Sequence, residues 1–278
     1  MRVGRSTPEI HIGPPRAWAT PDLRQVWRFR ELLYFLAWRA IKVRYKQTLI
    51  GAAWAILQPV LSMAVFSLIF GGLLRVPSEG IPYPVFSYAA LLPWMFFASA
   101  VTMASNSLVY DANLISKVYF PRLIIPLAAT VPPAIDLAVA FLVLIALLAF
   151  YGIVPGGAVL ALPLLVLLAW LTALGVGLWL SALNVKYRDV AYVVPFLMQV
   201  WFFVTPVVYP SGLIPDPLKA LYGLNPMVGV IDGFRWAVIG AQHGPDVSML
   251  VSVGTVAALL VSGLLYFRRT ESQFADVV

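Results

Sequence analysis

The sequence predicts an all-α integral membrane protein, and three observations support this fold class. Hydrophobic residues make up 61% of the 278 positions and charged residues only 11%, whereas soluble domains carry about 25% charged residues. The apolar residues gather into runs of about 20, the length that a helix needs to cross a bilayer. Lys and Arg lie at the ends of these runs, as in membrane proteins, rather than on one polar face, as in proteins that bind nucleic acids.

Six apolar runs are long enough to be transmembrane helices. They cover residues 49–74, 83–108, 123–151, 158–183, 190–209 and 247–267. If the chain starts in the cytoplasm, sixteen of its 19 Lys and Arg residues lie on cytoplasmic segments. The outer side then holds only Arg75, Lys219 and Arg235. This asymmetry predicts that both termini are cytoplasmic, and residues 48–269 form a single six-span domain.

The residues before the first run predict a helix that lies on the membrane surface. Residues 1–22 carry four prolines and no apolar core, so we expect a flexible cytoplasmic tail and not a signal peptide, and residues 270–278 form a second tail. On a helix, residues 23–47 place cationic side chains on one stripe and apolar side chains opposite. Such a helix lies in the headgroup plane. The alternative is that these charges only flank the first span.

The cytoplasmic connection at residues 109–122 predicts a short amphipathic helix. Asp111 can cap a helix that runs through Lys117. This arrangement leaves Leu114, Ile115 and Val118 exposed unless a partner binds them. The alternative is a short interfacial helix that rests on lipid.

The outer segment 210–245 predicts two short re-entrant helices. Its apolar pieces, 213–224 and 226–240, are too short to span a bilayer. Asn225 suits the cap of the second helix and Pro226 suits its first turn. Backbone at membrane depth needs a setting lined by protein or water, which two packed short helices provide. A surface hairpin is the alternative.

Aromatic residues and one acid lie within the predicted spans. Trp201 to Phe203 lie mid-span, roughly 15 Å from either end, so an interfacial belt does not explain them. They either pack the helix bundle or line a passage in which sugar rings stack on aromatic faces. Asp136 is the one acid inside a predicted span. It either serves polar packing, faces a water-filled cavity, or carries ions in a secondary carrier.

Several kinds of chemistry are missing from the sequence. The chain has no cysteine, which excludes disulfides, thiolate catalysis and cysteine-ligated metals. Its two histidines, His11 and His243, lie far apart in the sequence. The nucleotide-binding motif G-x-x-x-x-G-K-[ST], the zinc motif H-E-x-x-H and the nucleophile motif G-x-S-x-G are absent. The sequence therefore predicts no catalytic, cofactor or metal residues, and the chain reads as a pore or carrier subunit.

Several ordered motifs resemble the ABC-2 type permeases of bacterial polysaccharide and O-antigen exporters. The resemblance extends from about residue 23 to 269 and rests on Arg44–Gly51 with Trp54 and Gln58-Pro59, Leu92–Trp94 with Phe96-Phe97, Asn113–Arg122, Asn184–Asp189 and Asn225-Pro226. It implies a homodimer of six-span subunits in the bacterial inner membrane. Each dimer would work with two copies of a separate subunit that binds ATP and Mg and carries out the hydrolysis.

The resemblance also implies roles for particular residues. The coupling contacts with the ATPase would be Asn113, Leu114, Ile115, Ser116, Lys117, Lys186, Arg188 and Asp189. The channel at the dimer interface would be lined by residues among Trp54, Trp94, Phe97, Trp201, Phe202, Phe203 and Tyr209. The outer gate would include Asn225, Pro226, Asp232 and Arg235.

The cargo stays open at this stage. Arg24, Arg28 and Arg39 are our own candidates for attracting the pyrophosphate of a polyprenyl-linked glycan, because guanidinium groups pair with phosphate oxygens bidentately. The same family would also fit teichoic acid, capsule, glycolipid or drug export. From other classes, an ion-coupled secondary carrier would depend on Asp136, and a membrane enzyme acting on lipid would need polar catalytic groups at one membrane face.

Overall fold

The computed structural model describes residues 23–46, 53–240, 246–271 and 274, and the regular elements in this part of the chain are all helical. The elements are, in order, α1 (Leu23–Arg28), α2 (Arg30–Lys46), α3 (Ala53–Phe66), the π-helical η1 (Ser67–Leu73), α4 (Tyr83–Tyr110), α5 (Ala112–Lys117), α6 (Ile124–Ala129), α7 (Val131–Phe150), η2 (Gly157–Ala161), α8 (Leu162–Lys186), α9 (Val190–Val204), η3 (Ser211–Leu213), α10 (Asp216–Tyr222), α11 (Pro226–Ile239) and α12 (Val247–Glu271).

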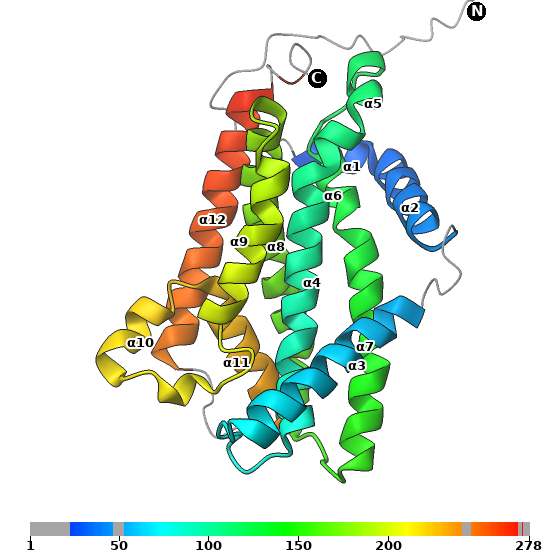
Figure 1. Cartoon of the computed structure of the whole chain (residues 1–278). Coiled ribbons are helices and arrows are strands. Elements are labelled where there is room, and N and C mark those ends of the chain that lie inside the picture. Colours follow the sequence, from blue (N-terminus) through cyan, green and yellow to red (C-terminus); the bar gives the residue numbers. More distant parts are fainter. Residues whose placement is uncertain (1–22, 47–52, 241–245, 272–273, 275–278) are drawn as a thin grey trace, which may run out of the picture.

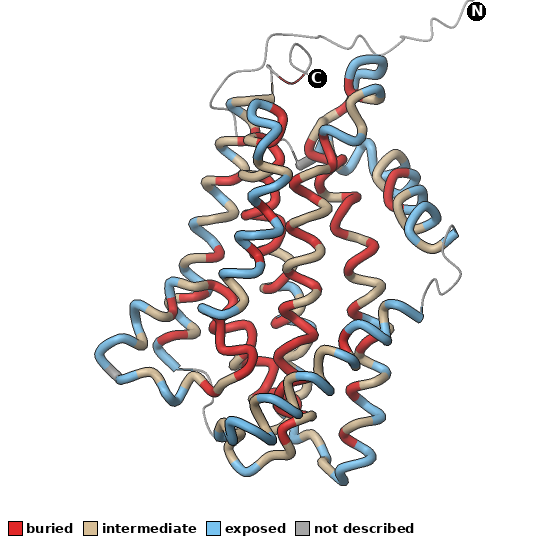
Figure 2. Tube along the Cα trace, viewed as in Figure 1, coloured by how far each residue is buried: buried red, intermediate tan, exposed pale blue. Residues whose placement is uncertain are grey.

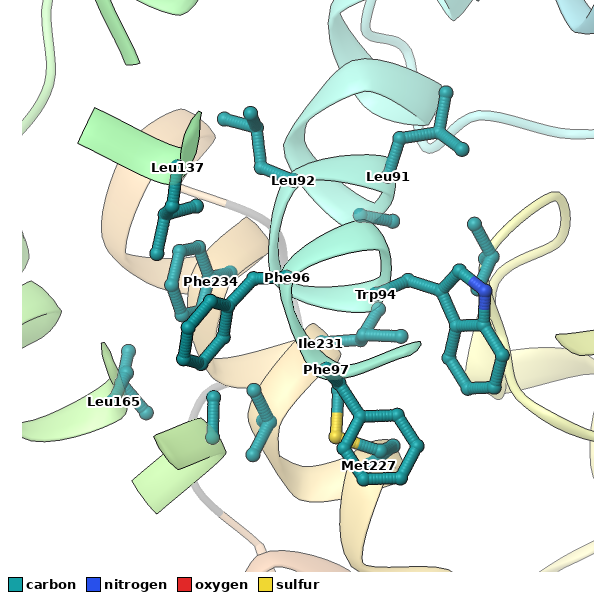
Figure 3. Close-up of a cluster of buried hydrophobic side chains, with 14 of the residues drawn as sticks. Leu91, Leu92, Trp94, Phe96, Phe97, Leu137, Leu165, Met227, Ile231 and Phe234 are labelled. Atoms are coloured by element: carbon teal, nitrogen blue, oxygen red, sulfur yellow. The ribbon is translucent and has the colours of Figure 1, made fainter. Parts of the chain in front are cut away.

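Helix α4 is the centre of the bundle (Figures 1 and 2). Within its apolar window 78% of the residues are buried, against 6% for the α3–η1 span. It packs against α8, α7, α11, α6 and α3. In Figure 3, Phe96 of α4 points toward Leu137 and Phe234 of α7 and α11, while Trp94 points to the other side of α4. The side of α4 that carries Trp94 is turned toward α9, since the ring of Trp94 contacts that of Phe202.

Five helical segments of the described chain are long and apolar enough to span a membrane, not six. The predicted span 190–209 is wrong in its length, because α9 has 15 residues and is only about 22 Å long. Thr205 ends it in an extended conformation (φ −106°, ψ 142°). The cause is Pro206, which disfavours the helical conformation in the residue before it. Whether α9 counts as a sixth crossing stays a prediction.

The predicted span 123–151 is also divided, into α6 and α7. The break is at Thr130, just before Pro132 and Pro133, which cannot donate backbone hydrogen bonds. The Thr130 hydroxyl donates to the carbonyl of Leu127 at 2.8 Å and accepts from the indole N–H of Trp170 at 2.8 Å. The joint is therefore fixed by hydrogen bonds to two helices.

The outer segment is not a simple surface hairpin, because α11 is largely buried between α4, α8 and α12. The predicted cap is confirmed: the Oδ1 atom of Asn225 accepts a hydrogen bond from the backbone N–H of Met227 at 3.1 Å, and Pro226 is the first residue of the helix. Helix α10 lies outside the bundle beside α12 (Figure 1). That these helices are re-entrant stays a prediction.

The N-terminal helices lie across the outside of the bundle. A break at Phe29 separates α1 from α2, which packs against α6 and α7. Leu36 and Ala37 are its buried residues. Val43, which the helical pattern places on the apolar side, is exposed on the outside of the bundle. That this side of the helix lies in the acyl chains stays a prediction. The predicted tail 1–22 lies outside the described residues.

The last helix extends past its predicted end at residue 267. Glu271 belongs to α12, and its carboxylate accepts a hydrogen bond from the backbone N–H of Arg122 at 3.2 Å. Phe274 is buried, with its ring centroid 5.2 Å from that of Phe267. Glu271 and Phe274 of the predicted tail 270–278 therefore contact the rest of the protein, and the cytoplasmic location of this tail stays a prediction. Because Arg122 follows α5, the contact also places the end of α12 on the same side of the bundle as α5 (Figure 1).

Candidate functional site

A cavity of about 1070 Å³ lies between α3, α4, α7 and α9, with the end of α2 at its rim. Its size is at the upper end of what small-molecule sites show. Its lining combines aromatic rings, polar side chains and one pair of charged groups. The lining residues include Trp54, Gln58, Ser62 and Phe66 of α3, Trp94, Phe96, Ser99 and Thr102 of α4, Asp136 of α7, Gln199, Phe202 and Phe203 of α9, and Arg44 and Tyr45 of α2.

Four of the predicted channel-lining aromatic residues lie on this cavity wall. They are Trp54, Trp94, Phe202 and Phe203. The ring centroids of Trp94 and Phe202 are 5.6 Å apart, and the ring of Phe66 is 5.5 Å from that of Phe202. Rings from three helices thus meet at one side of the cavity. A wall of this kind can stack against the apolar faces of sugar rings, and the roles of these residues in transport stay predictions.

The other three predicted aromatic residues contact protein rather than the cavity. Phe97 is fully buried and packs edge-on against Trp201, with ring centroids 5.2 Å apart. The indole N–H of Trp201 donates to Oδ1 of Asn225 at 2.9 Å. The hydroxyls of Tyr209 and Tyr222 are 2.9 Å apart. These rings connect α4 and α9 to the outer helices α10 and α11, so in this structure they pack the bundle.

Asp136 has a cationic partner that the sequence did not suggest. The Nη2 atom of Arg44, at the end of α2, lies 2.6 Å from Oδ2 of Asp136, and the hydroxyl of Tyr45 donates to Oδ1. Burial and then this hydrogen bond raise the pKa of Tyr45 to about 12, so its O–H stays protonated at physiological pH. The predicted spans contain no Lys, Arg or His that could pair with Asp136, and the partner comes from the surface helix instead.

Arg44 is the residue that sequence reasoning missed, although a signal for it existed. On a helix of 100° per residue, Arg44 lies about 40° around from Ala40 and about 20° from Leu33. It therefore belongs to the apolar side of the predicted surface helix and not to the cationic stripe. An arginine on the side that faces the bundle predicts a buried partner. Asp136, the one acid within a span, was the available candidate.

The predicted short helix is present as α5, with two differences in detail, and its role as a coupling helix stays a prediction. Ile115 is only 5% exposed and packs in a cluster with Leu36, while Leu114 is partly buried against the same cluster. The expected exposure of Ile115 is therefore wrong. The Asp111 side chain makes no cap hydrogen bond and instead forms an ion pair with Arg39, so the predicted cap is also wrong.

At the end of the bundle that carries α5, the exposed side chains are not those of Leu114 and Ile115. Asn113, Ser116 and Lys117 of α5 are exposed, as is the turn between α8 and α9. That turn holds Lys186, Arg188 and Asp189. The apolar groups exposed near α5 are Tyr110, Val118 and Tyr119. Contact of this surface with an ATPase stays a prediction.

At the outer end, Arg235 is a buried structural residue. It is 3% exposed, and its guanidinium donates to the carbonyls of Val207, Tyr209 and Phe86 at 2.7, 3.2 and 3.4 Å. Its guanidinium carbon also lies 3.6 Å from the centroid of the Phe86 ring. Asp232, three residues earlier on α11, is partly buried. Together with Asn225 and Pro226, these residues fix α11 to α4 and to the segment after α9, and their role as an outer gate stays a prediction.

The three predicted pyrophosphate-attracting arginines do not reach the cavity. Arg24 and Arg28 are exposed on α1, and Arg39 is paired with Asp111 outside the cavity. Among the described residues that line the cavity, the charged side chains are those of Arg44 and Asp136. No group of three or more possible metal-ligating His, Cys, Asp or Glu residues occurs in the part of the chain that the structure describes.

Comparisons with known proteins agree with this architecture. Residues 31–239 match the ABC-2 type transporter family. The chain is 30% identical over 260 residues to the O-antigen export system permease protein RfbA of Myxococcus xanthus, covering 92% of this chain and 98% of that protein. It is 30% identical to the protein of the same name from Klebsiella pneumoniae, covering 89% and 95%. It is 24% identical to the polysialic acid transport protein KpsM of Escherichia coli, covering 86% and 93%. The chain therefore belongs to the ABC-2 type transporter family of multi-pass membrane proteins.

Proposed function

We propose that this chain is the membrane-spanning subunit of an ATP-driven exporter that moves a lipid-linked polysaccharide, such as O-antigen, across the bacterial inner membrane. The observation that carries the proposal is the cavity beside α4, whose walls combine aromatic rings in edge-on and tilted contact with polar side chains. The names of the relatives point to the same class of cargo. Membership of the ABC-2 family favours this reading over an ion-coupled carrier.

The lining supports a carbohydrate cargo for a chemical reason. A sugar ring has apolar C–H faces and a rim of hydroxyls, so it suits a site with both aromatic and hydrogen-bonding groups. Trp94 and Phe202 offer the first kind of group, while Gln58 and Gln199 offer amide donors and acceptors. A purely apolar drug would leave these amides without partners, which is costly in a low-dielectric site. The lining does not discriminate among glycans.

A second copy of the chain would complete the passage. The wall formed by α3 belongs to a helix of which only 6% of the apolar window is buried. Its outer side exposes Leu61, Val65 and Leu68, and α9 exposes Val193 and Phe196. In a homodimer, these two helices would face their counterparts and enclose the cavity on its open side. The model of two permease copies with two ATPase copies rests on the family resemblance.

The energy would come from a separate ATP-binding subunit. This chain carries no phosphate-loop motif, so ATP and Mg would be held by that partner. The surface on α5 and the α8–α9 turn would receive the partner, with Asn113, Lys117 and Arg188 as contacts. The positive-inside bias supports a cytoplasmic location for this end and for both termini.

Single-cysteine cross-linking tests the proposal, because the natural chain has no cysteine. The Lys117→Cys variant, cross-linked in native membranes, should yield an adduct with a nucleotide-binding subunit identified by mass spectrometry. Val154→Cys is the matched control, since Val154 is exposed beyond the opposite end of α7, and it should capture no such subunit. If a soluble cytoplasmic reagent labels Cys at 117 but no ATPase is captured, the exporter assignment is wrong.

A further inference from the structure

The ion pair at the cavity rim has an uneven geometry. One arm of the Arg44 guanidinium, Nη2, lies 2.6 Å from Oδ2 of Asp136. The other arm, Nη1, lies 3.3 Å from the thioether sulfur of Met103, which is a weak acceptor. The guanidinium therefore makes one strong contact where its fork can make two parallel ones. A phosphate group, with several oxygens, can satisfy both arms.

We propose that Arg44 is a phosphate-binding residue at the mouth of the cavity, and that Asp136 is a built-in counter-ion which the phosphate displaces. The proposal rests on the proposed function, because it assigns a site for the phosphate of a lipid-linked cargo. The same chemistry is offered by the headgroup of an anionic phospholipid. In the structure as it stands, Asp136 holds the place that a ligand oxygen would take.

The surroundings of the pair allow this exchange. The Arg44 side chain is 37% exposed and that of Asp136 is 19% exposed, so the cation is the more accessible partner from outside. Arg44 and Asp136 both line the cavity, with Tyr45 beside them. When Asp136 moves away, the Tyr45 hydroxyl loses its acceptor and can donate to a phosphate oxygen instead. An arginine and a phenol then face the same anion.

The position along the membrane also suits a lipid phosphate. Arg44 belongs to α2, which lies along the outside of the bundle rather than within it (Figure 1). Its partner Asp136 is on α7, and Trp54, at the start of α3, lies on the same cavity wall. A lipid that lies beside α3 would thus bring its headgroup to Arg44 and its attached sugar to the aromatic wall. Arg39, one turn and a half earlier, is held by Asp111 away from the cavity.

Binding of farnesyl diphosphate to the purified full-length chain in nanodiscs of neutral phosphatidylcholine, measured by isothermal titration calorimetry, tests the site. Arg44→Gln should weaken binding at least about tenfold, because a hydrogen-bonded charge contact is lost. Asp136→Asn should strengthen binding about tenfold, because the competing carboxylate is gone. Lys42→Gln is the matched control on the same helix and should leave affinity unchanged, because Lys42 lies over the ring of Trp38 and does not line the cavity. Arg44→Lys keeps the positive charge but not the forked guanidinium, so its affinity should lie between those of the natural chain and Arg44→Gln.

Nanodiscs that contain phosphatidylglycerol separate the two sources of phosphate. If phospholipid headgroups occupy the site, this lipid should lower the affinity of the natural chain for farnesyl diphosphate and leave that of Arg44→Gln unchanged. If only the diphosphate lipid fits, phosphatidylglycerol should change neither affinity. The proposal is wrong if Arg44→Gln binds as the natural chain does, if Lys42→Gln loses as much affinity, or if Asp136→Asn binds more weakly. The assay needs neither ATPase nor transport, so its failure is distinct from that of the exporter assignment.

Discussion

Arg235 offers a sharp test of how the outer helices are held. Its guanidinium connects α11 to α4 and to the segment after α9 through three backbone carbonyls and the face of Phe86. Arg235→Met keeps the length and the apolar stem of the side chain but removes all five donors. The carbonyls of Val207 and Phe86 are then buried without this donor, since both residues are fully buried.

The expected loss follows from these contacts. Each hydrogen bond to a charged group contributes about 1.5–3 kcal/mol, and the gross loss is partly offset because a buried charge no longer has to be desolvated. We expect a net destabilisation of about 3–5 kcal/mol, as for the loss of one partner from a buried charged network. Arg235→Lys should lose less than Arg235→Met, because the ammonium group keeps the charge and some of the hydrogen bonds. It should still lose some stability, because it reaches fewer of the three carbonyls in their fixed positions.

Thermal unfolding of the purified chain in detergent measures the effect. For a chain of this size each kcal/mol corresponds to about 2–4 °C, so Tm of Arg235→Met should fall by at least about 6 °C, with Arg235→Lys between it and the natural chain. A Tm within about 1 °C of the natural chain would refute the reasoning. Such a result would mean that the contacts of Arg235 contribute little to stability, and its predicted role at the outer gate would then be the better explanation for this residue.

Two further predictions concern helix packing and coupling. Gly263→Ala should destabilise the chain by about 1–3 kcal/mol, because the added Cβ would lie 2.6 Å from the carbonyl oxygen of Gly175 on α8. Gly254→Ala is the control, because Gly254 is on the same helix and has open space around it, and it should leave Tm unchanged or slightly higher. Equal losses of Tm in the two variants would contradict the packing argument. Arg39→Ala should change Tm little, since the Arg39 side chain is 51% exposed and such ion pairs contribute little to stability. It should nevertheless lower export per ATP hydrolysed in the reconstituted exporter by freeing α2 from α5. Asp111→Asn should do the same, and normal coupling in both variants would exclude this tether.

Most of the membrane-spanning helices could be predicted from the sequence, because the length of a hydrophobic run depends only on neighbouring residues. The runs that became α3, α4, α8 and α12 were found with small errors at their ends. The cap of α11 was also predicted correctly, since Asn225 and Pro226 act on backbone groups within one turn. The length of α9 was wrong because the extended bias that Pro206 imposes on Thr205 was not weighed against the apolar run.

Contacts between residues far apart in the chain were decided by the tertiary structure alone. Arg44 and Tyr45 meet Asp136 because α2 packs against α6 and the start of α7. Likewise, whether an apolar residue faces a cavity or a neighbour depends on the rotation of each helix, which is why Phe202 lines the cavity while Phe97 is buried. Sequence by itself determined which segments are helical and apolar, since that depends on neighbours within a few turns. It could not determine which faces meet, because packing depends on the shapes of all the surrounding helices at once.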